Sequence, residues 1–163
     1  MSLLAEDKRT LFIGQSVRFS GHVMFDTLQE AHVPMRKRIE LPVFEDTQMG
    51  ISIGLALGGF IPISIYPRMD FLIIAMNQLV NHLDKIEEMT CFKSKVIIRT
   101  MIGSKSPLNP GPQHCQDHTE ALRLLLPNIN VIKLSSANHV VDNYRRALEG
   151  SDSTILVEIG DMY

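Results

Sequence analysis

The sequence predicts an α/β protein in which a mainly parallel sheet lies between two layers of helices, a three-layer α/β/α arrangement. Short apolar segments alternate with helical segments along the whole chain. The segment FIPISIY over 60–66 is continuously apolar and β-branched, which is typical of a strand buried on both faces. With 163 residues, no repeat and no linker, the chain is expected to form one domain over 1–163.

The first half of the chain supplies three expected strands. The first is predicted over 10–15, followed by a helix over 17–31. A short strand over 38–43 leads into a helix that carries glycine at positions 50, 54 and 58. The buried strand over 60–66 precedes a long helix, which Asp70 is expected to cap and which extends to about Glu88.

The second half repeats the alternation. A strand is predicted over 95–101, and three prolines and two glycines then predict a loop over 103–113. A helix over 116–126, a strand over 130–134, a helix over 137–149 and a strand over 154–159 complete the expected order.

Composition narrows the class of function. The formal net charge of −2 argues against a nucleic-acid or anionic-membrane surface. No apolar run reaches the roughly 18 residues expected of a membrane span. Cys91 and Cys115 match no metal or disulfide pattern, so a reducing, cytoplasmic compartment is expected. The phosphate loop, the GxGxxG turn and the GxSxG elbow are missing from the sequence.

The segment ELPVFEDTQMGISIGLALGG over 40–59 is the most informative one. An apolar run ends in Glu45, and a helix with three glycines on one face follows. Each glycine costs about 1 kcal/mol relative to alanine, so such a helix usually brings another backbone very close. Its other positions are apolar nearly all round, as in a buried helix. Glu45 is explained either by the positive end of this helix or by a functional role.

Three functional side chains are expected at one edge of the sheet. Parallel sheets bind ligands at the carboxyl ends of their strands. Glu45, the turn from Pro67 to Phe71 and the loop ending in His114 all fall there. His114 taken alone is better explained as a polar residue of a surface loop. His114 and His118 could lie one helical turn apart, but no third ligand is evident, so no metal site is predicted. No strained nucleophile turn surrounds Cys115, so a nucleophile pair with His114 is not predicted either.

These segments also carry a resemblance. ELPVFE and MGISIGLALGG resemble the TPISE segment and glycine-bearing helix in beta subunits of thiamine-diphosphate-dependent 2-oxo acid dehydrogenases, of the pyruvate, branched-chain and acetoin types. The similarity continues through PISIYPRMDFLIIAMNQLVNHLDK and KVIIR, and QHCQD resembles the family's HSQ motif. It spans about residues 10–163 and implies the pyrimidine-binding domain of the transketolase-like superfamily.

The resemblance implies roles for four residues. Glu45 matches the glutamate that hydrogen-bonds the aminopyrimidine ring of the cofactor, so that the exocyclic imine can deprotonate the thiazolium carbon. Phe71 matches the aromatic residue that packs on the pyrimidine, and Val43 lies near it. His114 matches the histidine that faces the 2-oxo acid substrate and the incoming lipoyl group.

Partners are implied as well. The family's alpha subunit carries a GDG…N motif that holds the diphosphate through Mg²⁺. The helix with Gly50, Gly54 and Gly58 resembles one that crosses its counterpart at a subunit interface, which implies a homo-oligomer. A dihydrolipoyl acyltransferase is the implied acyl acceptor. Residues 147–152 resemble a loop that holds potassium through backbone oxygens in some members.

The sequence also departs from the family. Gln15 and Ser16 replace an acidic pair, and the chain ends at Tyr163, where the family's C-terminal domain is expected to begin. Two functions are therefore expected. The first is an enzyme subunit, inactive alone, that shares a site with an alpha-type partner. The second is a shortened, non-catalytic relative that serves as an oligomerisation or interaction module. The presence of Glu45, Phe71 and His114 together favours the first.

Overall fold

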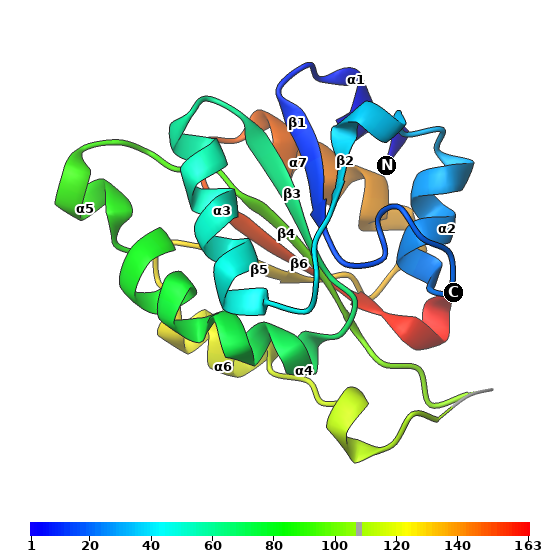
Figure 1. The fold of residues 1–163 in the computed structure, drawn as a ribbon. Helices are drawn as coiled ribbons and strands as arrows, with labels where there is room; N and C mark the ends of the chain where they lie inside the picture. The colour runs from blue at the N-terminus through cyan, green and yellow to red at the C-terminus, as the bar shows by residue number, and fades with distance from the viewer. Residues whose placement is uncertain (107–108) are drawn as a thin grey trace.

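Six parallel strands form a single sheet in the computed structural model, which describes residues 1–106 and 109–163 (Figure 1). Their order across the sheet is β2-β1-β3-β4-β6-β5. The expected parallel sheet is therefore confirmed. The strands are β1 (Thr10–Gly14), β2 (Arg38–Glu40), β3 (Ile61–Tyr66), β4 (Ile97–Ile102), β5 (Asn130–Lys133) and β6 (Thr154–Ile159).

Helices cover both faces of this sheet, as predicted (Figure 1). One core cluster joins the sheet to α1 (Ser2–Glu6), α2 (Val23–Glu30) and α7 (Val140–Glu149). The other cluster joins the opposite face to α3 (Glu45–Leu57), α4 (Met69–Leu72), α5 (Ile86–Thr90) and α6 (Thr119–Leu125). Within the described residues, no helix has the length and apolar character needed to cross a bilayer.

The helix predicted over 17–31 is shorter than expected, because it begins only at Val23. The carboxylate of Glu40 accepts hydrogen bonds from the backbone amides of Ser16, Val17 and Arg18, at 2.8, 2.8 and 2.7 Å. These bonds fold the segment after β1 around a carboxylate at the end of β2. Its backbone donors are therefore satisfied without a helix.

The long helix predicted from Asp70 to Glu88 is wrong in detail. The segment divides into α4, a 3-10 turn (Ile73–Ala75), a π-helical stretch (Gln78–Leu83) and α5. Asp70 is no cap, because Arg68 occupies the N-cap position. The apolar spacing predicted the buried side of this segment. It does not determine whether each amide bonds to the carbonyl three, four or five residues earlier, which is what distinguishes 3-10, α and π helices.

The remaining predicted elements differ mainly at their ends. The helix predicted over 116–126 starts at Thr119, whose amide and hydroxyl donate to Asp117 at 3.0 and 2.6 Å. A 3-10 turn (Ala137–His139) precedes α7 within the helix predicted over 137–149. Part of the loop predicted over 103–113, at 107–108, lies outside the described residues.

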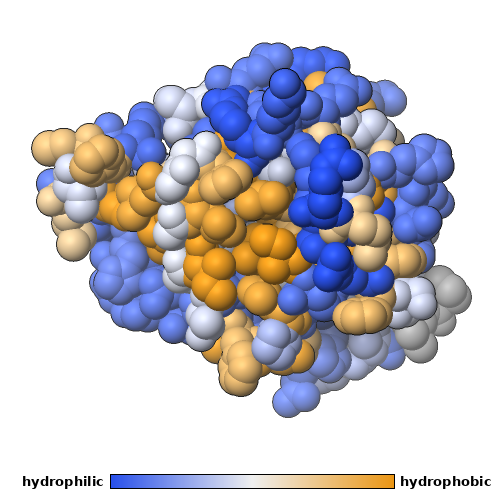
Figure 2. Space-filling model, turned by 45° about the horizontal axis from the view of Figure 1, so that its top comes forward, coloured by the Kyte–Doolittle hydropathy of each residue, from blue (hydrophilic) through white to orange (hydrophobic). Residues whose placement is uncertain are grey.

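The helix α3 is not buried all round. Its side bearing Met49 and Ile53 packs in the core, but Ile51 and Leu57 are 40% and 49% exposed. A Cβ placed on Gly54 would meet no atom within 4 Å. Figure 2 shows a broad apolar area on this side of the molecule. We call the exposed set the α3 apolar face: Ile51, Leu57, Phe60, Ile73 and Ile74.

Candidate functional site

The three side chains expected at one edge of the sheet all follow carboxyl ends of strands. Glu45 comes after β2 and opens α3, and Phe71 lies in α4 directly after β3. His114 ends a short 3-10 turn (Pro112–His114) in the segment that follows β4. The parallel topology thus gathers an acid, an aromatic ring and an imidazole at the edge where ligands of such sheets bind.

Glu45 is buried at the start of α3, with 3% of its surface exposed. Its Oε1 accepts a hydrogen bond from Gln15 Nε2 at 3.2 Å, and its backbone carbonyl accepts one from the Tyr66 hydroxyl at 3.3 Å. The described hydrogen bonds give Oε2 no protein partner. The helix N-terminus favours the negative charge of this carboxylate, and Oε2 is left without a protein partner among the described residues.

Gln15 is positioned by a glycine that no other residue can replace without movement. Gly14 ends β1 at φ +140°, and a Cβ there would lie 2.2 Å from the Ile65 carbonyl oxygen. It would also lie 2.7 Å from Gln48 Nε2, which donates to that same oxygen at 2.9 Å. Gln15 was not predicted as a site residue. The one signal in the sequence was the glycine before it, because a glycine can mark a place where two backbones approach closely.

Phe71 and His114 contact each other edge to face. Their ring centroids lie 5.3 Å apart, with the planes inclined at 71°. Both residues are half-buried. His114 Nδ1 is buried and has no hydrogen-bond partner among the described residues. An unpaired buried nitrogen is costly, so this atom is a natural contact for a ligand or a water molecule.

Two contacts anchor the segment that carries His114. A Cβ on Gly103 would lie 1.9 Å from the His114 carbonyl oxygen, so only glycine allows this approach at the end of β4. Asp70 Oδ1 accepts hydrogen bonds from the amide and the side chain of Gln116, at 3.2 and 3.0 Å. Asp70, predicted as a helix cap, instead ties α4 to the chain just beyond His114.

Val43 differs from the other predicted residues. Its side chain is 69% exposed, and that of Phe44 is 63% exposed. Both lie in the short connection between β2 and α3, next to the buried Glu45. The structure therefore places Val43 at the outer surface of this edge and not in an enclosed wall.

The comparison with protein families matches nearly the whole chain to one family. Residues 1–160 match the model described as the pyrimidine binding domain of transketolase. The chain belongs to this family. The expectation drawn from the resemblance is thus confirmed for the family and for the fold.

Relatives of this pyrimidine-binding domain include two dehydrogenase beta subunits. The pyruvate dehydrogenase E1 component subunit beta of Mycoplasma genitalium is 26% identical, over 98% of this chain and 49% of its own length. The 3-methyl-2-oxobutanoate dehydrogenase subunit beta of Mycobacterium tuberculosis is 28% identical, over 77% of this chain and 38% of its own. The chain therefore spans about half or less of the curated relatives it matches.

Solved structures share the fold of the domain. A split gene transketolase, described as an inactive beta4 tetramer, matches 93% of this chain with a TM-score of 0.71 and 18% identity. The transketolase from Campylobacter jejuni matches 96% with a TM-score of 0.67 and 15% identity. This chain covers 45% and 23% of those two proteins.

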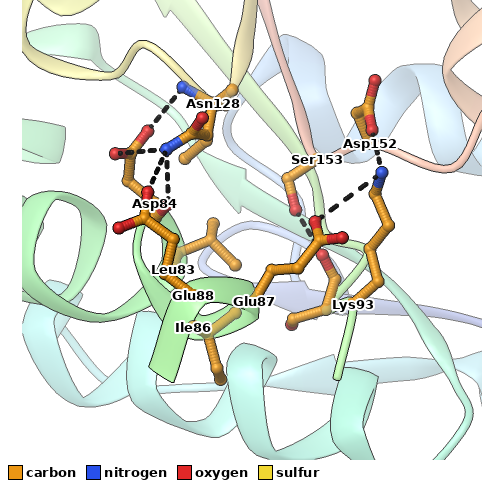
Figure 3. Close-up of a pocket in the computed structure, with 11 residues that line it drawn as sticks. Leu83, Asp84, Ile86, Glu87, Glu88, Lys93, Asn128, Asp152 and Ser153 are labelled. Carbon is orange, nitrogen blue, oxygen red and sulfur yellow. Dashed lines mark hydrogen bonds and ion pairs between the residues drawn. The ribbon is translucent and has the colours of Figure 1, made fainter. Parts of the chain in front are cut away.

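A separate cavity of about 320 Å³ lies at the opposite edge of this pyrimidine-binding domain (Figure 3). Ser94, Asn128 and Ser153, which line it, precede β4, β5 and β6. They therefore lie at the amino ends of the strands, away from Glu45. Asp84 is buried there and accepts a hydrogen bond from the Asn128 amide at 2.9 Å. Within the described residues, no group of three or more side chains is arranged to hold a metal ion.

Proposed function

We propose that this chain supplies the pyrimidine-binding half of a thiamine diphosphate site that acts on a 2-oxo acid. The chain is inactive alone, and an alpha-type partner completes the site. The family match and the two dehydrogenase beta-subunit relatives support this proposal. The observation that carries it is the buried carboxylate of Glu45, whose Oε2 has no protein partner among the described residues at this edge of the sheet.

The residues at this edge fit an aminopyrimidine ring. Oε2 of Glu45 is available to share a proton with a ring nitrogen, while Gln15 orients the carboxylate through Oε1. The half-buried ring of Phe71 offers an apolar surface for the flat heterocycle. Thiamine diphosphate, when bound, supplies the nucleophilic carbon that 2-oxo acid chemistry requires.

His114 is the proposed contact for the substrate and for the acyl acceptor. Its ring packs against Phe71, and its buried Nδ1 lacks a partner among the described residues. A bound substrate oxygen would satisfy that nitrogen. We propose a lipoyl group carried by a dihydrolipoyl acyltransferase as the acceptor that approaches this histidine.

The diphosphate and its Mg²⁺ are assigned to the partner, because the GDG…N motif is missing from this sequence. The α3 apolar face is the proposed contact with a second copy of the chain. Gly54 leaves open space on that face, so another backbone can approach it closely. The free thiols of Cys91 and Cys115 agree with the cytoplasmic location proposed here.

The alternative function is a non-catalytic interaction module. The exposed α3 apolar face favours it, because an interaction module needs an apolar surface for binding another protein and does not need a buried carboxylate. The presence of Glu45, Phe71 and His114 at one edge favours the enzyme subunit, because self-association needs none of them.

Affinity capture from native lysate separates the two functions. The tagged chain is purified, and bound proteins are identified by mass spectrometry. The enzyme proposal expects a partner that carries a GDG…N motif, and the purified complex should decarboxylate a 2-oxo acid only when thiamine diphosphate and Mg²⁺ are present. Recovery of the chain with copies of itself alone, and no such turnover, would support the module.

A further inference from the structure

The loop after α7 has its backbone oxygens occupied by a side chain of the same protein. The helix ends at Glu149, and the carbonyl oxygens of Leu148 and Gly150 both accept hydrogen bonds from Lys95 Nζ. Lys95 lies just before β4, far from this loop in the sequence. Its ammonium group therefore sits among carbonyl oxygens at the end of a helix.

Such a position attracts a cation for a general reason. The last carbonyls of a helix have no amide partner within it, and they carry the negative end of the helix dipole. A potassium ion or an ammonium group can satisfy them, since both carry one positive charge and accept several oxygen neighbours. A tethered ammonium has the advantage of a high effective concentration, because the chain itself holds it near the oxygens.

Neighbouring residues secure the same loop with further donors. Lys93 Nζ pairs with Asp152 Oδ1 at 2.6 Å, as Figure 3 shows. The Val96 amide donates to the hydroxyl of Ser153 at 3.0 Å, and that hydroxyl donates to the Ser94 carbonyl at 2.9 Å. The segment leading into β4 thus supplies amide and ammonium donors along the whole loop leading into β6.

We propose that Lys95 is a built-in cation for this loop and takes the place of a free alkali-metal ion. The loop over 147–152 resembles one that holds potassium in some relatives. The residues present here do not fit that ion, because Lys95 already engages two of the carbonyl oxygens. The loop should therefore be ordered without potassium. This inference does not depend on the proposed enzyme function.

Thermal unfolding of the full chain tests the inference. Tm is measured in potassium, sodium and choline chloride at equal ionic strength. The wild-type Tm should agree among the three salts to within about 1 °C, since no free ion is bound specifically. Lys95→Met should lower Tm by about 3–6 °C, because the carbonyl oxygens lose their cation.

Lys133→Met is the matched control, because it removes the same charge from an ion pair with Asp117 elsewhere on the surface. It should shift Tm by less than about 2 °C. A wild-type Tm several degrees higher in potassium than in sodium would overturn the inference. Equal Tm values for Lys95→Met and Lys133→Met would also overturn it. If Lys95→Met fails to fold, the salt comparison on the wild type still decides.

Discussion

Gln15 Nε2 donates a hydrogen bond to Glu45 Oε1 at 3.2 Å, and this bond joins the end of β1 to the start of α3. The donor is an amide, which does not titrate. Oε1 of Glu45 therefore lies beside a neutral donor, which orients the carboxylate without adding a charge of its own.

Replacing Gln15 tests this orientation. Gln15→Leu removes the donor and leaves Oε1 buried without its partner. Losing a hydrogen bond to a charged group costs about 1.5–3 kcal/mol, so turnover of the reconstituted complex should fall about 10- to 100-fold. Gln15→Glu should also lower turnover, because it replaces the donor to Oε1 with a carboxylate that repels Glu45. Unchanged kinetics in both variants would remove Gln15 from the site.

Gly103 is predicted to position His114. In Gly103→Ala the new methyl group would overlap the His114 carbonyl oxygen, so the segment must shift and the ring must leave Phe71. We expect a loss of stability of about 1–3 kcal/mol and a loss of turnover in the complex. Gly54→Ala is the control for stability, because its methyl group meets nothing within 4 Å in the same chain. Equal stability of the two variants would contradict the proposed positioning.

The α3 apolar face is predicted to mediate self-association. Gly54→Leu adds a bulky side chain in open space, so the fold of one chain should tolerate it. A second copy could then no longer approach the helix closely, so light scattering should report an oligomer for the wild type and a smaller species for this variant. Gly54→Ala should reduce association less. An oligomer unaffected by leucine would place the interface elsewhere.

His22 makes the stability of the domain depend on pH. Its Nδ1 accepts a hydrogen bond from the Met24 amide at the start of α2. Burial, followed by the charges of Arg68 and Arg99, lowers the pKa of His22 from 6.5 to about 4, while Asp26 opposes the shift. As pH falls, His22 therefore takes up a proton near pH 6.5 in the unfolded chain but only near pH 4 in the folded protein.

The stabilisation from neutral His22 is thus complete above pH 6.5 and is lost as pH falls through that window to about 4. His22→Asn keeps a cap acceptor but cannot titrate. Denaturant unfolding between pH 7 and pH 4.5 should show a steeper loss of stability for the wild type than for this variant. Parallel stability curves would contradict the lowered pKa.

The strands were predictable because burial on both faces leaves a continuous apolar run, as in Ile61–Tyr66. The edge that gathers Glu45, Phe71 and His114 was predictable for a related reason, since parallel topology brings carboxyl ends together. The loop before α2 was not predictable. It depends on bonds to Glu40 from amides 22 to 24 residues away, and such bonds leave no periodic pattern.

The exposure of α3 escaped prediction for a different reason. An apolar helix has the same sequence pattern whether its own chain or another chain covers it, so Ile51 and Leu57 were expected inside. The role of Gln15 beside Glu45 was not predictable, because one glutamine forms no recognisable sequence motif. Only the approach of Gly14 to the Ile65 carbonyl shows that its position is constrained.

Glu45→Gln tests the central proposal most directly. The amide keeps the size of the side chain but cannot share a proton with the pyrimidine ring. Turnover of a 2-oxo acid by the complex with the alpha-type partner should fall by orders of magnitude, while the thermal stability of the variant stays close to that of the wild type. Turnover close to the wild-type rate would contradict the role of Glu45 and with it the proposed site.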